Sequence, residues 1–183
     1  MHQRGENKIT NTLWVALLLS ALAVSSARSE TITGKVVGVA DGDTITVLDA
    51  VNAQHKIRLS GIDAPEKAQP FGQRSKAAMS ALVFGKEVDV VAGKRDRYGR
   101  LIGRVLVAQP SCTTDVCPKT VDAGLAQLTL GMAWWYRHYA REQSAADAGA
   151  YEIAEHAARA HQLGLWRDAE PVAPWDWRHP VRR

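Results

Sequence analysis

The sequence is poor in the features that define several protein classes. Only two cysteines occur among 183 residues, too few for a small domain built on disulfides instead of a core. Neither sign of charge dominates, because 23 Lys and Arg stand against 19 Asp and Glu. The net charge of +4 permits a polyanionic partner but does not identify one. With 14 Gly, 7 Pro and 46% hydrophobic residues, a collagen-like or wholly disordered chain is excluded, and about one globular domain is expected.

A hydrophobic run long enough to span a bilayer, which takes roughly 20 residues, is also lacking near the N-terminus. The apolar run Leu13–Val24 follows Arg4 and Lys8 and precedes Ser25-Ser26-Ala27. This order is typical of a secretory signal peptide, and the alternative is an uncleaved membrane anchor. We expect residues 1–27 to be a signal peptide cleaved after Ala27. The mature protein would then be exported, periplasmic or secreted, without stable membrane association.

The two cysteines lie close together in a polar stretch. Cys112 and Cys117 flank Thr-Thr-Asp-Val. In an oxidising compartment this spacing favours a local disulfide that closes a surface loop. Free thiols are the first alternative. A metal site is the second, but it would need two further ligands and no His lies in the neighbouring sequence.

Hydrophobic periodicity divides the remaining chain into a strand-rich half and a helix-rich half. Short β-branched segments bounded by Gly, Pro and Asp predict strands, and apolar residues at helical spacing that end at Gly predict helices. We expect an α+β fold, a small closed antiparallel barrel of the five-stranded OB-fold kind with about three packed helices. The domain would cover residues 28–170, and the Trp- and Pro-rich tail, 171–183, would wrap the surface. The expected strands are 31–39, 44–48, 54–59, 87–92 and 101–107, and the expected helices are 73–84, 120–130 and 144–163.

Three short stretches carry the candidate chemistry. They are Asp41-Gly-Asp-Thr44, then Arg58-Leu-Ser-Gly-Ile-Asp-Ala-Pro-Glu66, then Asp96-Arg-Tyr-Gly-Arg100. Taken singly, each has a plain structural reading: a hairpin turn, a solvated acidic loop after a strand, and a charged hairpin tip. Taken together, they provide oxygen ligands for a divalent cation, a further carboxylate and two guanidinium groups. Hydrolysis of a phosphodiester needs this set, because the charge of the phosphate must be screened and a water activated.

The order and spacing of the three stretches resemble the staphylococcal nuclease (thermonuclease) family, in register from about Thr31 to Gly164. The resemblance implies an OB-type barrel with three helices and Ca²⁺-dependent cleavage of DNA and RNA. The sequence gives no clear oligomerisation surface, and we expect a monomer. The resemblance also implies roles for seven residues. The expected metal ligands are Asp43, Asp63 and the backbone carbonyl of Ala64, the expected catalytic residues are Arg58, Glu66 and Arg100, and the expected substrate-binding residue is Tyr98.

Some positions depart from the best-known member of that family. Ala64 replaces Thr, which should leave a main-chain ligand usable. Arg137 stands where that member has a base-stacking Tyr, so Trp135, Tyr136 or Tyr139 could supply a stacking face. A core role for Trp134 and Trp135 is the favoured alternative. The Cys112–Cys117 loop and the segment 175–178 are additions, to which we assign stabilising roles.

Two other functions fit parts of the pattern. One is a nucleic-acid-binding OB-fold module that has lost catalysis, which loss of Arg58, Glu66 or Arg100 would favour; all three are present. The other is a structural or adhesive exported module whose charges are incidental. The sequence therefore favours an exported Ca²⁺-dependent endonuclease.

Overall fold

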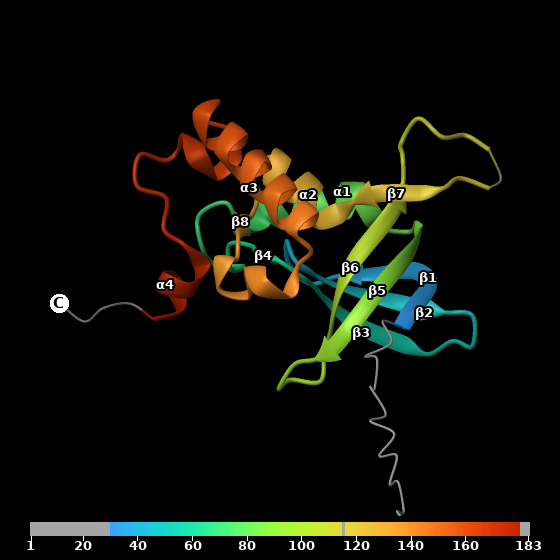
Figure 1. Cartoon of the computed structure of the whole chain (residues 1–183). Coiled ribbons are helices and arrows are strands. Elements are labelled where there is room, and N and C mark those ends of the chain that lie inside the picture. The colour runs from blue at the N-terminus through green and yellow to red at the C-terminus, as the bar shows by residue number, and fades with distance from the viewer. Residues whose placement is uncertain (1–29, 115, 180–183) are drawn as a thin grey trace, which may run out of the picture.

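The computed structural model describes residues 30–114 and 116–179, and the expected signal peptide lies outside them. Figure 1 shows a β-barrel with helices gathered at one end. The six-stranded sheet has the order β3-β2-β1-β5-β6-β7. Its strands are β1 (Glu30–Val39), β2 (Thr44–Asp49), β3 (Gln54–Leu59), β5 (Glu87–Arg95), β6 (Leu101–Ala108) and β7 (Lys119–Asp122).

Five of these strands form a closed barrel. A pairing between β3 and β6, with Ile57 opposite Leu101, joins the two ends of the five-strand run, and β7 extends the sheet beyond β6. The closing pair is parallel, whereas the other pairs in the sheet are antiparallel. A closed ring with an odd number of strands cannot alternate direction throughout, so the expectation of a wholly antiparallel barrel was wrong. The α+β fold class with an OB-like barrel is confirmed.

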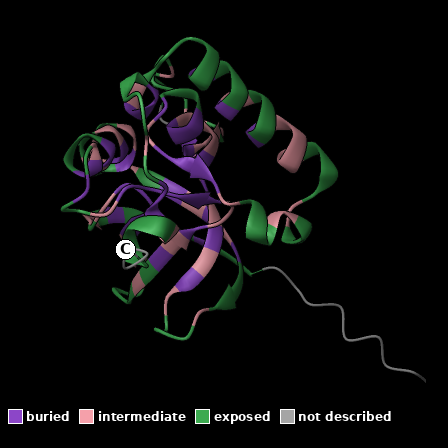
Figure 2. Cartoon of the chain, turned by 90° about the vertical axis from the view of Figure 1, so that its left-hand side faces the viewer, coloured by how far each residue is buried: buried purple, intermediate pink, exposed green. Residues whose placement is uncertain are grey.

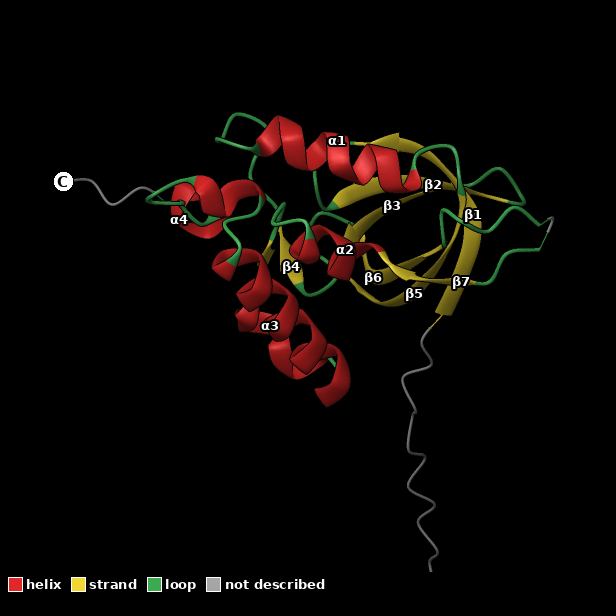
Figure 3. Cartoon of the chain, turned by 90° about the horizontal axis from the view of Figure 1, so that it is seen from above, coloured by secondary structure: helices red, strands yellow, loops and turns green. Residues whose placement is uncertain are grey.

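Two helices pack against the barrel, and a third packs mainly on the second of them. They are α1 (Gly72–Val83), α2 (Ala123–Thr129) and α3 (Ala145–Ala160). Figure 3 shows α2 between α1 and α3, and Figure 2 shows that buried residues gather where these elements meet. The core combines alternate residues of the strands with the inner faces of the helices. Its fully buried members include Val36, Ile45, Ile57, Met79, Val90, Val105, Leu128 and Tyr151.

One helix begins later than the sequence suggested. The expected helix 120–130 starts at Ala123, because residues 119–122 pair with β6 as strand β7. Asp122 ends the strand and caps the helix, since its side chain accepts hydrogen bonds from the amides of Gly124 and Leu125. An Asp at this position satisfies amides that would otherwise lack partners.

A short two-stranded pairing places the acidic loop against the helical part. Strand β4 (Ile62–Asp63) pairs with β8 (Trp134–Trp135), with Asp63 opposite Trp134. The sequence suggested only a loop here. Both tryptophans are buried, which confirms their core role. The chain then forms the 3₁₀ helix η1 (Arg137–Glu142).

The C-terminal segment folds back onto the molecule. After the 3₁₀ helix η2 (Gly164–Arg167), the short helix α4 (Pro174–Arg178) lies at the end of the molecule opposite the loop that precedes β7 (Figures 1 and 3). A second apolar cluster holds it there, in which Trp134, Trp166 and Ala173 are buried and Trp175 is partly buried.

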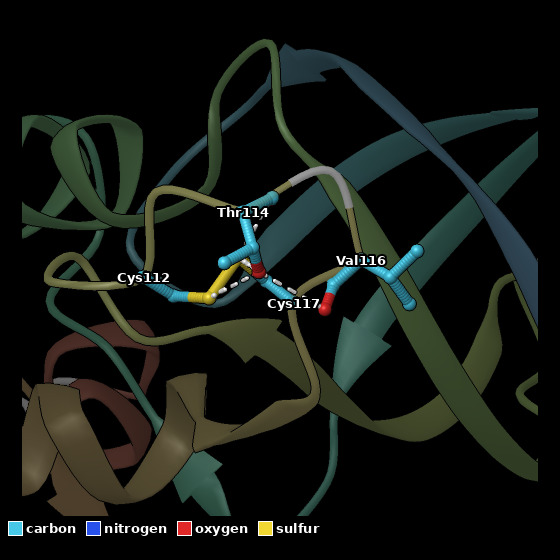
Figure 4. Close-up of a disulfide and its surroundings, with 4 residues drawn as sticks. All are labelled: Cys112, Thr114, Val116 and Cys117. Carbon is cyan, nitrogen blue, oxygen red and sulfur yellow. Dashed lines mark hydrogen bonds between the residues drawn. A yellow bond between two sulfur atoms is a disulfide. The ribbon is translucent and has the colours of Figure 1, made fainter.

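The loop before β7 carries the two cysteines. Cys112 and Cys117 form a disulfide (Figure 4). Within the ring that it closes, the Thr114 hydroxyl donates a hydrogen bond to the Val116 carbonyl. Within residues 30–114 and 116–179, no helix has the length and apolar character needed to cross a bilayer.

Candidate active site

One open pocket gathers the residues that the three sequence motifs singled out. It has a volume of about 750 Å³ and lies between the acidic loop, the β5–β6 hairpin and helix α4. Ser75 and Gln127 contact the turn that carries Asp43, one of the residues that line the pocket. Among the pocket's lining residues are all seven expected site residues, Asp43, Arg58, Asp63, Ala64, Glu66, Tyr98 and Arg100.

The turn between β1 and β2 presents Asp43 to this pocket. Asp41 accepts a hydrogen bond from the Asp43 amide at 3.0 Å, so its side chain helps to hold the turn. Gly42 is packed so closely that an added Cβ would lie 1.8 Å from the Ser75 hydroxyl oxygen. The side-chain amide of Gln127 donates to the Gly42 carbonyl at 2.8 Å. Helices α1 and α2 therefore fix the position of this turn.

Arg58 links the two buried carboxylates. It lies near the end of β3, where Ile57 and Leu59 point into the core. One terminal nitrogen pairs with Asp43, and Nη2 donates to Asp63 Oδ1 at 2.8 Å. The Ala64 amide donates to Asp43 Oδ2 at 2.8 Å. Asp43, Arg58 and the acidic loop therefore form one connected polar network.

The acidic side chains of the network differ in their electrostatics. Although burial opposes ionisation of Asp43, the positive charge of Arg58 and the Ala64 hydrogen bond lower the pKa of its carboxyl. Burial, and then the negative charge of Asp43, raise the pKa of Asp41 to about 6. Burial also raises the pKa of Asp63, against the opposing effect of Arg178 and Arg58. Additional positive charge near these three aspartates would favour the ionised forms of their carboxyl groups.

Glu66 lies at the more exposed edge of the pocket, with 39% of its side chain accessible. Gln69 holds its backbone, because the Gln69 side chain accepts from the Glu66 amide at 3.0 Å and the Gln69 amide donates back to the Glu66 carbonyl. Gly72 packs over the same carbonyl, which would lie 2.0 Å from an added Cβ. The position of the loop is thus well defined, while the carboxylate reaches outward.

The β5–β6 hairpin supplies the opposite wall. Asp96 accepts hydrogen bonds from the amides of Tyr98 and Arg100, and its Oδ2 lies 2.6 Å from the Arg100 Nε. These contacts, all within the Asp96-to-Arg100 motif, hold the tip of the hairpin in its folded form. Tyr98 is 68% exposed, with the guanidinium groups of Arg97 and Arg100 over its ring.

One arginine of the pocket, on helix α4, was missed by the sequence reasoning. Arg178 of α4 donates to both oxygens of Asp63, from Nη1 at 3.2 Å and from Nη2 at 2.6 Å. Its Nη1 also donates to Glu66 Oε1 at 2.7 Å. We had assigned the segment 175–178 to stabilisation alone. Its only sequence signal was an Arg in an aromatic tail, and no spacing connects that Arg to residues more than 100 positions earlier.

Arg137 has a structural partner instead of a stacking role. Its Nη1 lies 2.8 Å from the Glu155 Oε2, and the buried Glu155 also accepts from the Trp135 amide. The guanidinium lies over the Trp135 ring. Tyr136 and Tyr139, by contrast, both line the pocket.

The oxygen atoms of Asp43, Asp63 and Ala64 are of the kind that bind a divalent cation. Within the described residues, no three His, Cys, Asp or Glu side chains are already grouped as a metal cluster. The carboxylates of Asp43 and Asp63 converge on Arg58, beside the backbone of Ala64. Carboxylate and carbonyl oxygens are the ligands that Ca²⁺ prefers. The residues therefore fit this ion in chemistry, although the side chains are arranged around guanidinium groups.

Comparison with known proteins agrees with this geometry. A family model described as staphylococcal nuclease homologue matches residues 56–168, which include the acidic loop and the β5–β6 hairpin. The chain belongs to the staphylococcal nuclease family. The resemblance seen in the motifs is thus confirmed.

Relatives in this nuclease family match most of the chain. It is 41% identical over 167 residues to the protein ParB of Escherichia coli, covering 91% of this chain and 90% of ParB. It is 40% identical over 173 residues to a micrococcal nuclease of Shigella flexneri, covering 90% and 87% of the two chains. An uncharacterized endonuclease of Escherichia coli is 40% identical over 146 residues, covering 80% of this chain and 84% of its own length.

Proposed function

We propose that this protein is an exported, Ca²⁺-dependent endonuclease that hydrolyses phosphodiester bonds of DNA and RNA. The observation that carries the proposal is the convergence of Asp43, Asp63 and Glu66 with Arg58 and Arg100 in one pocket. Two relatives that cover most of the chain are named as an endonuclease and a micrococcal nuclease. A module that only binds nucleic acid would need no such combination of carboxylates and arginines.

The two expected catalytic arginines would bind the scissile phosphate from different walls of the pocket. Asp96 accepts from the Arg100 Nε–H, and the terminal amino groups can then donate to two phosphate oxygens. The planar guanidinium matches that pair of acceptors and stabilises the charge that builds up on them during attack. Arg58 is held beside the carboxylates, where it balances their charge and approaches the same phosphate.

The carboxylates would divide two tasks. Asp43, Asp63 and the Ala64 carbonyl would hold Ca²⁺, which when bound would provide Lewis acidity and positive charge next to the phosphate. Glu66 is more exposed than either aspartate. It would orient the attacking water and accept its proton.

The proposed location rests on two features. The sequence pattern of residues 1–27 is that of a signal peptide. The Cys112–Cys117 disulfide is typical of proteins in oxidising compartments outside the cytosol. We propose that the mature protein acts as a monomer in the periplasm or outside the cell.

Digestion of plasmid DNA and of a long RNA by the mature protein tests this proposal. Cleavage of both is expected with Ca²⁺, and none with excess chelator. A Glu66→Gln variant purified in parallel identifies any contaminating nuclease, because it should be nearly inactive. Binding without cleavage by the unmodified protein would favour the catalytically inactive OB-fold module instead.

A further inference from the structure

Helix α4 brings a positive side chain to two carboxylates that lie far from it in the sequence. Arg178 bonds to both oxygens of Asp63 and to Glu66 Oε1, at distances between 2.6 and 3.2 Å. The side chain of Arg178 is 37% exposed, whereas that of Arg58 is 17% exposed. Arg58 therefore approaches Asp63 from the interior, and Arg178 approaches it from the side of the solvent.

The packing of α4 holds this arginine in place. Trp175 stacks on Tyr136, with ring centroids 5.4 Å apart and an angle of 14° between the planes. The same indole meets Trp134 edge-on at 5.6 Å. Since Trp134 of β8 pairs with Asp63 of β4, the surface that receives Trp175 is formed by β8 and the residue after it, next to the strand that carries the carboxylate.

A second connection joins the C-terminal segment to the Glu66 loop. The Gln69 side chain accepts from the Glu66 amide through its oxygen, and its nitrogen donates to the Val172 carbonyl at 2.7 Å. Gln69 is only 6% exposed, so these bonds are shielded from water. One buried amide therefore ties the backbone of Glu66 to the segment that leads into α4.

Arg178 is the partner of the Glu66 carboxylate in the described part of the chain. A half-exposed glutamate otherwise has several rotamers, and restricting them before the reaction improves the orientation of a general base. The contacts with Asp63 and Glu66 use three of the five N–H groups of an arginine. Arg178 can thus orient both carboxylates at once.

We propose that Arg178 is a positioning residue, which α4 brings into the pocket to orient Glu66 and Asp63 for the reaction. This inference rests on the proposed function and extends it: the C-terminal helix completes the active site. The segment then has a role beyond the stabilisation that its aromatic content suggests. Because Arg178 acts through Glu66, its loss should lower turnover more than it weakens substrate binding.

The test compares Arg178→Ala and Arg178→Lys with the unmodified full-length mature protein. Loss of a group that orients an active-site side chain usually lowers activity about 10- to 100-fold. We expect a kcat reduction of that size for Arg178→Ala, with KM changed less than about threefold. Arg178→Lys should recover part of kcat, since it keeps the charge but not the planar fork. Millimolar guanidinium chloride should recover part of the Arg178→Ala rate.

Two further variants separate positioning from general charge or stability effects. Arg167→Ala removes the same charge from an exposed arginine that does not line the pocket, and it should cleave normally. Trp175→Ala keeps Arg178 but removes the ring that stacks on Tyr136, and it should lower kcat in the same direction. Thermal unfolding of each variant reports whether it is folded at the assay temperature.

The outcomes distinguish this inference from the function on which it rests. If the unmodified protein cleaves and Arg178→Ala has the same kcat, the positioning role is wrong and the nuclease proposal stands. If Arg178→Ala binds Ca²⁺ more tightly in calorimetry and cleaves faster, Arg178 competes with the cation and the inference is overturned. If the unmodified protein does not cleave, both proposals fail.

Discussion

The two walls of the pocket are built in different ways. On one side, Asp43 and Asp63 are almost fully buried, and Arg58 pairs with both of them. On the other side, Arg100 and Tyr98 sit on a hairpin whose tip is folded by hydrogen bonds to Asp96. The buried wall is therefore part of the core, whereas the hairpin wall depends on local contacts. Substitutions on the first should change both stability and activity, and substitutions on the second should change activity alone.

The largest combined effect is expected for Arg58→Ala. This change leaves Asp43 without its guanidinium partner, and breaking a buried ion pair costs about 3–5 kcal/mol of stability. The loss of one group that stabilises transition-state charge lowers turnover by about 10²–10³. Urea unfolding and initial cleavage rates measure the two quantities. A variant as stable as the unmodified protein would show that the buried wall does not depend on this pair.

Arg100→Ala sharpens the comparison, because it should separate the two effects. Turnover should again fall by about 10²–10³. Stability should fall by no more than about 1 kcal/mol, since the Arg100–Asp96 pair is partly exposed and local. Arg104→Ala, on the strand β6 that follows Arg100, is the matched control. Its partners, Asp122 and Asp147, lie outside the pocket, so it should keep its turnover. Near-normal cleavage by Arg100→Ala would reject its role.

A smaller effect is expected at the tip of the hairpin. The resemblance places Tyr98 beside a terminal phosphate, and one hydrogen bond from its hydroxyl would contribute about 1 kcal/mol. Tyr98→Phe should therefore raise KM about fivefold and leave kcat and the unfolding midpoint unchanged. Tyr98→Ala is the companion variant. If Phe behaves like the unmodified protein and only Ala raises KM, the ring makes the contact and the hydroxyl does not.

The smallest effect on activity is expected from opening the disulfide. Cys112 and Cys117 are five positions apart, and closing so small a ring stabilises the fold by no more than about 2 kcal/mol. None of the loop residues that the structure describes lines the pocket. The Cys112→Ser, Cys117→Ser double variant should cleave at the normal rate, with a lower melting temperature. A large loss of turnover would show that the two ends of the molecule are coupled.

The same contrast explains how much could be predicted from the sequence. The barrel strands and the motifs that meet in the pocket were predictable, because alternating β-branched residues and short motifs such as Asp41 to Thr44 encode local structure. The start of α2 could not be predicted, because the pairing of Lys119–Asp122 with β6 overrode the helical pattern. The parallel β3–β6 closure is a property of the whole ring. Arg178 was missed because its contacts depend on tertiary packing of α4, which no local pattern records.

We propose that Asp43 and Asp63 form the cation site of a phosphodiester-cleaving pocket. The most direct test is the cleavage rate of the full-length mature protein as a function of free Ca²⁺, compared with that of Asp63→Asn. We predict a rate that is undetectable in chelator and saturates with Ca²⁺, and a response shifted to much higher Ca²⁺ in the variant. Undiminished cleavage in excess chelator, or identical Ca²⁺ curves for the two proteins, would contradict the claim.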